Sequence, residues 1–274
     1  MAKPTGFLGF VTRPFRHSGP VIPVVRLHGV IAADQRAGRI NMQMAAPLLH
    51  RAFEMPGNTV AIIVNSPGGS AVQSRLISKR IRDLAAENDK HVIVFVEDAA
   101  ASGGYFIATA GDEIIADPSS IVGSIGVIFA GFGFPEALSK LGVERRVHTA
   151  GKNKSTLDPF LPEKAEDVER IKQMELDIHQ VFIDWVKSRR GTKLKASDDQ
   201  LFTGEFWSGL RGLELGLVDA LGDLHETLVT RFGKDVVTKV IEPKRGFFRL
   251  PTFGLAADIA ASIEDRALWT RLGL

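Results

Sequence analysis

Residues 98–129 read DAAASGGYFIATAGDEIIADPSSIVGSIGVIF, and the rest of the chain is organised around them. An apolar run from His91 to Val96 precedes this stretch, and its Val, Ile and Phe content is typical of a buried strand. Ala99 to Ala101 end the run, Ser102 follows, and a helical-looking run extends from Tyr105 to Ala110. The pattern predicts a strand-to-helix turn with an accessible hydroxyl at its tip, where a nucleophile could sit.

Ser102 alone has a simpler interpretation, because serine is a preferred helix N-cap. A second segment favours a chemical role. Residues 65–69, NSPGG, directly follow an apolar run from Thr59 to Val64. Pro67 fixes its own φ, and the two glycines behind it let the backbone turn sharply and approach a ligand closely. By itself this segment is an ordinary strand-to-helix connection.

Two more segments add to the pattern. Residues 150–160, AGKNKSTLDPF, follow a predicted strand from Val143 to Thr149 and have the Gly, Asn and Pro content of a loop. Lys154 lies in this loop, where a lysine is usually a solvated charge. Small residues also open a predicted strand at Gly123 to Val127.

Taken together, these segments resemble the signal peptide peptidase A family of serine peptidases. The matching pieces occur in the family's order and extend over most of the chain between residues 22 and 222. They are NSPGGS (65–70), AASGGYFIA (100–108), GSIGVI (123–128), GKNKSTLDPF (151–160) and FTGEFWSGLRGLELGLVDALG (202–222).

The resemblance implies an α/β fold of the Clp-protease and crotonase-like type, with a ββα-type core. It also implies that Ser102 is the nucleophile, that Lys154 is the general base, and that Gly68, Gly69 and Gly103 form the oxyanion hole. The chemistry is consistent, since serine needs a neighbour to take its proton and lysine can do so only when neutral. An apolar, water-poor site favours the neutral amine, and a Ser-Lys pair is a known variant of the catalytic triad.

Other residues near these motifs remain candidates. Lys152 is the rival base, and His148 is the histidine that could approach the site. Ser124 could orient the base, because a hydroxyl can hold a neutral amine by hydrogen bonding. Four residues are expected to shape the substrate groove: Ser66, Pro67, Ser70 and Tyr105.

Composition excludes several other classes of function. The 274 residues are 45% hydrophobic and carry a net charge of +2, which fits a globular chain with one substantial core and gives no reason to propose nucleic-acid binding. There is no cysteine, so disulfides and thiolate chemistry are excluded. The seven histidines are scattered without metal-ligand spacing, and two partial phosphate-binding and dinucleotide motifs fail on key residues. We expect neither a metal nor a cofactor.

The predicted organisation is one peptidase domain with two appendages. The domain covers residues 21–242, between an N-terminal extension (1–20) and a C-terminal tail (243–274) that we expect to dock on a neighbouring subunit or a membrane surface. The start of the chain lacks the long uncharged region of a secretory signal, and no window is apolar enough to span a membrane. These features depart from the usual membrane-anchored family members and predict a cytoplasmic protein, with peripheral membrane contact left open.

Alternating apolar runs and helical runs predict a parallel sheet with crossover helices, whose sites lie beyond the carboxyl ends of the strands. We expect a long helix from Pro162 to Arg190 that projects from the domain. Predicted strands are Val21 to Ile31, Thr59 to Val64, His91 to Val96, Glu113 to Ala116, Ile125 to Phe129, Val143 to Thr149 and Val236 to Ile241.

The predicted function is a serine endopeptidase that cleaves extended apolar peptides through an acyl-enzyme. Signal-peptide remnants and similar membrane-derived or unfolded segments are the expected substrates. The resemblance also implies a homo-oligomer, in the form of a ring or dome. Two alternatives are a crotonase-type acyl-CoA enzyme, which would use carboxylates beside the same oxyanion hole, and an inactive oligomeric scaffold in which Ser102 only caps its helix.

Overall fold

The structure is a computed structural model and describes residues 19–36, 38–243 and 265–274. The strands are β1 Val21–His28, β2 Val30–Ile31, β3 Arg39–Ile40, β4 Thr59–Ser66, β5 His91–Ala101, β6 Glu113–Ala116, β7 Ile121–Gly123, β8 Phe206–Ser208, β9 Ala220–Leu221 and β10 Val237–Val240. The helices are α1 Met42–Phe53, α2 Ala71–Glu87, α3 Gly103–Ala108, α4 Pro135–Lys140, α5 Ala165–Arg190, α6 Asp198–Leu201, α7 Gly209–Leu215 and α8 Leu224–Phe232, with a 3₁₀ turn at Gly191–Lys193.

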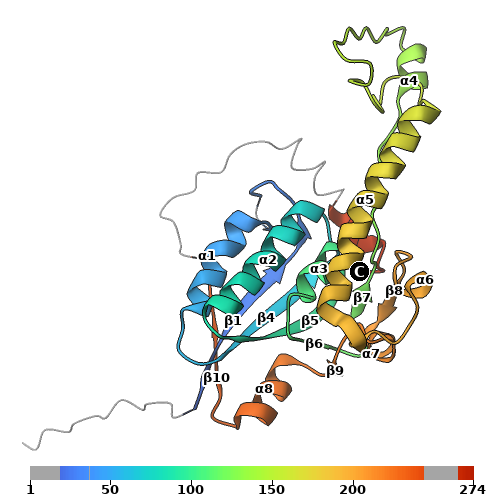
Figure 1. Cartoon of the computed structure of the whole chain (residues 1–274). Helices are drawn as coiled ribbons and strands as arrows, with labels where there is room; N and C mark the ends of the chain where they lie inside the picture. Colours follow the sequence, from blue (N-terminus) through green and yellow to red (C-terminus); the bar gives the residue numbers. More distant parts are fainter. Residues whose placement is uncertain (1–18, 37, 244–264) are drawn as a thin grey trace, which may run out of the picture.

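A parallel sheet forms the centre of the molecule, in the strand order β10-β1-β4-β5-β6-β9 (Figure 1). Every residue of β4 is buried, which is the pattern of a strand covered on both faces. Parallel neighbours need crossover connections, and α1 and α2 supply two of them. The expected α/β fold with a mostly parallel sheet and crossover helices is therefore confirmed.

The alternating direction of side chains along the strands divides the core between the two faces of the sheet. Val25 and Leu27 of β1 contribute to the larger cluster, which includes residues of α1, α2, α3 and α5. Ile22 and Val24 of the same strand face the smaller cluster, where Leu228 of α8 packs. Successive side chains of a strand point to opposite faces, so one strand serves both layers.

Strand β5 is longer than expected, because pairing continues past Val96 to Ala101. Its first half pairs with β6, and its last three residues pair with β7, which in turn pairs antiparallel with β8. The register against β4 shifts between Val64 and Ser66, so that Ser66 lies opposite Ala100. Because β4 and β5 are parallel, their carboxyl ends lie at the same rim of the sheet.

A long arm projects from this body. We call residues 129–175, which contain α4 and the first turns of α5, the arm. In Figure 1, α5 runs away from the body and α4 lies at its far end. The 26 residues of α5 correspond to a length of about 39 Å. The C-terminal half of α5 packs on α3, where the Trp185 ring stacks on Phe106 with their centroids 5.5 Å apart.

Two predicted strands are wrong. Residues 143–149 form no strand, because they lie in the arm, where their mostly exposed backbone has no neighbouring strand to pair with. Residues 125–129 also form none, and the strand lies earlier, at Ile121–Gly123. The long helix begins at Ala165, after the predicted start at Pro162, and ends at Arg190 as expected.

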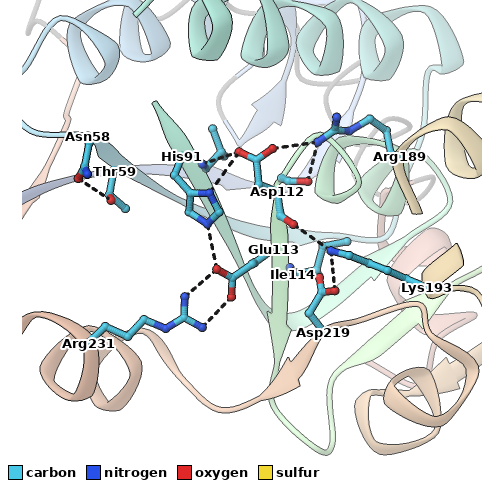
Figure 2. Close-up of polar contacts among 12 residues, drawn as sticks. Asn58, Thr59, His91, Asp112, Glu113, Ile114, Arg189, Lys193, Asp219 and Arg231 are labelled. Atoms are coloured by element: carbon cyan, nitrogen blue, oxygen red, sulfur yellow. Dashed lines mark hydrogen bonds and ion pairs between the residues drawn. The ribbon is translucent and has the colours of Figure 1, made fainter. Parts of the chain in front are cut away.

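Ion pairs connect the amino ends of β5 and β6 to the surrounding helices (Figure 2). Each acidic residue has at least two basic partners, and Asp112 has a third in His91, at 3.8 Å. Asp112 pairs with Arg82 and Arg189, Glu113 with His91 and Arg231, and Asp219 with Arg190 and Lys193. This network fixes the base of α5 and the end of α8 to the sheet, at the rim opposite Ser102.

The described end of the C-terminal tail contacts its own chain. Residues 265–270 are helical, and Asp265 pairs with Arg39 at 2.9 Å. The Trp269 ring stacks on His28, with centroids 6.2 Å apart. We expected the tail to dock on another subunit or a membrane, whereas this part lies against the body that carries it. Most of the predicted N-terminal extension, and residues 244–264 of the tail, lie outside the described residues.

Among the described helices, none combines the length and the apolar character needed to cross a bilayer.

Candidate active site

Ser102 occupies a strained turn directly after β5. Its φ of 50° and ψ of −119° are unusual for a residue with a side chain, and such conformations cost about 1–3 kcal/mol each. The Ser102 amide donates to the carbonyl of Gly123 at 2.8 Å, which ties the turn to β7. The side chain makes no cap hydrogen bond to α3, and the backbone lacks the extended conformation of an N-cap. The capping interpretation of Ser102 therefore has no support in the geometry.

The Gly68–Gly69 turn packs directly against Ser102. The φ angles are 109° and 136°, in the region that favours glycine. The turn is held by Ile31, whose amide donates to the Gly68 carbonyl and whose carbonyl accepts from Ser70, each at 2.8 Å. A Cβ atom on Gly68 would lie 2.8 Å from Cβ of Ser102, so a larger residue cannot occupy this position without displacement.

Two amides beside Ser102 have no hydrogen-bond partner in the part of the chain that the structure describes. No hydrogen bond from the amide of Gly69 or Gly103 is present among the described residues. The two are close, because a Cβ atom on Gly103 would lie 3.4 Å from the Gly69 nitrogen. The Gly68 amide, in contrast, donates to Oγ of Ser66 at 3.2 Å. Free amides on both sides of a serine can bind the oxyanion of a tetrahedral intermediate.

These groups open onto a cavity of about 770 Å³. Ser102, Gly103, Gly69, Pro67 and Ser124 line it, so the structure brings together residues that are far apart in the sequence. The remaining wall is mostly apolar and comes from α2, α3, α5, β8, the segment after β7 and the C-terminal tail. It includes Val72, Phe106, Val127, Ile128, Ile178, Val181, Phe182, Phe206, Leu268 and Leu272.

Ser124 lies next to Ser102 across the β5–β7 pair, since Ala101 is opposite Gly123. Its φ is 53°, and its amide donates to the Glu205 carbonyl at 2.7 Å. The expected closeness of Ser124 to the nucleophile is thus seen in the fold, and its role in orienting a base stays a prediction.

Tyr105 does not shape the groove, and that expectation is wrong. The side chain is fully buried, and its hydroxyl donates to the Leu217 carbonyl at 2.8 Å. Helix α3 presents Phe106 to the cavity and turns the neighbouring tyrosine into the core. Ser66 is also buried, and Ser70 caps α2 by accepting from the Gln73 amide at 3.4 Å.

Within one chain, the structure does not bring Lys154 to Ser102. Lys154 is exposed on the arm, in a segment held to the first turn of α5 by a bond from the Leu157 amide to Asp167. Along α5, the distance from Asp167 to Phe182 at the cavity is about 22 Å. The rival bases Lys152 and His148 lie in the same exposed segment. Among the described residues that line the cavity, none is a lysine, histidine or carboxylate.

The sequence interpretation missed the residues that the tail and α2 contribute. Leu268, Arg271 and Leu272 of the tail line the cavity, as does Arg75 of α2. The four-residue spacing of Leu268 and Leu272 is a signal of one helix face, but nothing in the sequence shows what that face covers.

A protein-family model described as peptidase family S49 matches residues 85–236, more than half of the chain. The chain belongs to peptidase family S49. The matched region contains Ser102, Ser124 and the arm with Lys154, and NSPGG at 65–69 lies before it. The expected membership of the signal peptide peptidase A type is confirmed by relatives that carry such names.

Two relatives show how far the similarity extends. The chain is 54% identical over 283 aligned residues to a protein named Na(+)/H(+) antiporter NhaA from Brucella melitensis, covering 96% of this chain and 38% of that protein. It is 33% identical over 171 residues to the chloroplastic serine protease SPPA of Arabidopsis thaliana, covering 61% of this chain and 24% of that protein. The chain thus spans well under half the length of both relatives.

A solved structure supports the S49 fold. The structure is that of a mutant of the membrane-bound stomatin-specific protease 1510-N, and it matches with a TM-score of 0.53 and 15% sequence identity. The match covers 83% of this chain and 100% of that one. At this level of identity, the likeness concerns the fold.

Proposed function

We propose that the protein is a serine endopeptidase that cleaves extended apolar peptides through an acyl-enzyme. The observation that carries this proposal is the strained Ser102 turn, with the free amides of Gly69 and Gly103 beside it at the floor of an apolar cavity. Membership of the S49 family and the serine protease name of the Arabidopsis relative support it.

In the proposed reaction, Oγ of Ser102 attacks the carbonyl carbon of the scissile peptide bond. The neutral amine of Lys154 takes the hydroxyl proton, and the amides of Gly69 and Gly103 bind the oxyanion that forms. When the tetrahedral intermediate collapses, the C–N bond breaks and the lysine ammonium gives its proton to the departing amine. Water then hydrolyses the ester by the same steps, which releases the second product and restores Ser102.

The position of Lys154 leads to a second element of the proposal. Because the cavity has no base of its own among the described residues, we infer that the arm of a second copy supplies Lys154. The arm exposes large apolar side chains that suit contact between subunits, including Phe132 at 81% and Leu141 at 75%. A homo-oligomer, as a ring or dome, would place each arm beside a neighbour's Ser102, and Ser124 would hold the incoming amine.

The cavity supports an apolar substrate. Side chains from α3 and α5 provide a hydrophobic wall, and its size falls within the usual range of ligand pockets. Signal-peptide remnants, or similar membrane-derived and unfolded segments, have the required apolar and extended character. The crotonase-type alternative is disfavoured, since that chemistry would use carboxylates and none lines the described cavity.

Complementation between two inactive variants tests the proposal. Wild-type protein, Ser102→Ala and Lys154→Ala are assayed on an internally quenched apolar peptide, with Lys152→Ala as the matched control. We expect both single variants to lose about 10⁴-fold or more in kcat and Lys152→Ala to stay active. Mixing the two inactive variants, dissociated and reassembled together, should restore about one quarter of the sites if each site combines two copies.

Three results of this experiment would each contradict a different part of the proposal. Activity in the single Lys154→Ala variant would exclude this lysine as the base. Two inactive variants that stay inactive in mixed oligomers would exclude a base supplied by a second copy. A wild-type protein that forms an intact oligomer and cleaves no peptide would favour an inactive scaffold.

A further inference from the structure

The cavity at Ser102 has an unbalanced charge. Two arginines, Arg75 and Arg271, line it, and no aspartate or glutamate does so among the described residues. Most of the remaining wall is apolar. Both arginine side chains are exposed, so their guanidinium groups are accessible to a ligand that enters this largely apolar cavity.

Arg271 is held at the cavity by the docked tail. Leu268 of the tail helix and Leu272 of the turn that follows it contribute to the same wall. The helix is attached to the body beside the cavity by the Asp265–Arg39 ion pair and by the stacking of Trp269 on His28. The amide of Arg271 continues the helical pattern by donating to the Ala267 carbonyl at 3.1 Å.

Arg75 reaches the cavity from α2, which begins directly after the Gly68–Gly69 turn. Neither Arg75 nor Arg271 has an ion pair or a side-chain hydrogen bond with any residue in the described ranges. Most other arginines that border the sheet do have such partners, for example Arg189 and Arg231. Two guanidinium groups without carboxylates are available to a ligand, and guanidinium is well suited to bind carboxylate.

We propose that the groove selects apolar peptides that carry a carboxylate, with Arg271 and Arg75 as the groups that recognise it. This inference rests on the proposed peptidase function and specifies its substrate class. The carboxylate has two sources in a peptide, an acidic side chain or the free C-terminus. Both present the same oxygen atoms to a guanidinium, so the experiment must separate them.

The test uses one apolar, internally quenched peptide in matched forms. One position of the peptide carries Glu, Gln or Lys, and separate peptides place this residue at different points along the sequence. Each peptide is made both with a C-terminal acid and with a C-terminal amide. We expect the best-placed carboxylate to raise kcat/KM about fivefold over its neutral partner, as for one partly exposed ion pair. A Glu effect that persists in the amide series identifies a side-chain carboxylate, and an acid-over-amide effect identifies the C-terminus.

In the variants Arg271→Gln and Arg75→Gln, the ratio of kcat/KM between carboxylate and neutral peptides should fall towards one. Arg266→Gln is the matched control, because Arg266 is exposed on the same tail helix and does not line the cavity. The preference should also shrink in 0.5–1 M salt, roughly following the Debye length. The inference would be overturned if all three variants kept the wild-type preference, or if the wild type turned over Glu and Gln peptides equally and acid and amide peptides equally. Either result would leave the peptidase function standing.

Peptide binding to the Ser102→Ala variant separates the carboxylate-selection proposal from the peptidase proposal. If the wild type cleaves no peptide, fluorescence anisotropy with fluorescently labelled forms of the same peptides still measures the affinity of the protein for each of them. Tighter binding of the carboxylate forms, lost in Ser102→Ala/Arg271→Gln, would support charge selection although the peptidase proposal had failed. Equal binding of all forms would overturn the charge selection as well.

Discussion

Tyr105 is the only tyrosine in the chain, and it lies beside the catalytic candidate without sharing its cavity. Burial raises the pKa of its phenol, and the hydroxyl donates to the Leu217 carbonyl. A group that stays protonated and bonded within the core can position α3 against the segment after α7. It cannot contact a peptide in the groove.

Replacement of Tyr105 by Phe should therefore affect stability and spare activity. We expect the free energy of unfolding to fall by about 1 kcal/mol, because the buried Leu217 carbonyl loses its donor. The value of kcat/KM should stay unchanged. Denaturant unfolding measures the free energy of unfolding, and peptide hydrolysis measures kcat/KM. Ser102→Ala is the control for the reverse case, because we expect it to lose activity while it stays folded. A tenfold loss of kcat at unchanged stability would show that the phenol acts on the substrate.

The two strands that end at the active-site rim are braced by Asn65 of β4. Its side-chain amide donates to Asp98 at 2.6 Å and its oxygen accepts from the Ala99 amide at 3.2 Å. Its carbonyl accepts from the Gly29 amide at 2.9 Å. These bonds lie where the β4–β5 register shifts, three residues before each of the Gly68 and Ser102 turns. Asn65 thus couples the position of the Gly68–Gly69 turn to the position of Ser102.

The substitution Asn65→Ala should lower kcat more than it changes KM. Loss of the brace lets the two turns move apart, and small misplacements of reacting groups cost about tenfold or more in rate. Stability should fall by about 1–3 kcal/mol, since the Ala99 amide is left buried without an acceptor.

Asn58→Ala, just before the amino end of the same strand, is the matched control for a change remote from the site. We expect it to leave kcat unchanged. Equal kcat values for Asn65→Ala, Asn58→Ala and the wild type would show that Asn65 serves stability alone.

The ion-pair network in Figure 2 connects the sheet, α8 and the base of α5 at the whole-molecule scale. Hydrogen bonds from Arg231 hold the pKa of Glu113 below its ordinary value. Burial acts to raise the pKa of Asp112, but the Val92 amide and the Arg82 guanidinium outweigh it, so the net direction is also downward. Carboxylates with lowered pKa values stabilise the folded state only while they are ionised.

The sign of the pH effect follows directly. The contribution of Glu113 is fully present above the pKa of the unfolded chain, about 4.3, and is lost as pH falls through the lower pKa of the folded state. We expect the midpoint of thermal unfolding to decrease as the pH falls below about 4. Arg231→Gln should lower stability at neutral pH by about 1 kcal/mol, or about 2–4 °C, and should flatten the acid dependence.

Calorimetry between pH 7 and pH 3 measures this dependence. Arg146→Gln is the control, because the Arg146–Glu144 pair is 76% and 73% exposed and should contribute little. Parallel curves for Arg231→Gln and the wild type would show that the Glu113 pair does not contribute to acid stability.

The sequence by itself determined the class of fold and the position of the Ser102 turn at the end of a strand. Apolar runs such as 59–64 and 91–96 are too hydrophobic for a strand with one wet face, so they predicted a sheet covered on both sides. Ser102 and the Gly68–Gly69 turn each follow a strand, and parallel strands end at one rim. These are local properties combined with one topological rule, which is why the sequence was sufficient for them.

Only the tertiary structure decided which groups share the cavity. The sequence places Lys154 in a loop after a predicted strand, Val143 to Thr149, but that loop lies on the arm, away from Ser102. Tyr105 and Phe106 are neighbours in sequence, and the packing of α3 sends one into the core and the other to the cavity. The docking of Arg271 depends on contacts with Arg39 and His28, more than 200 residues away in the chain. Such long-range contacts depend on how complete surfaces fit together, and no local pattern in the sequence records that fit.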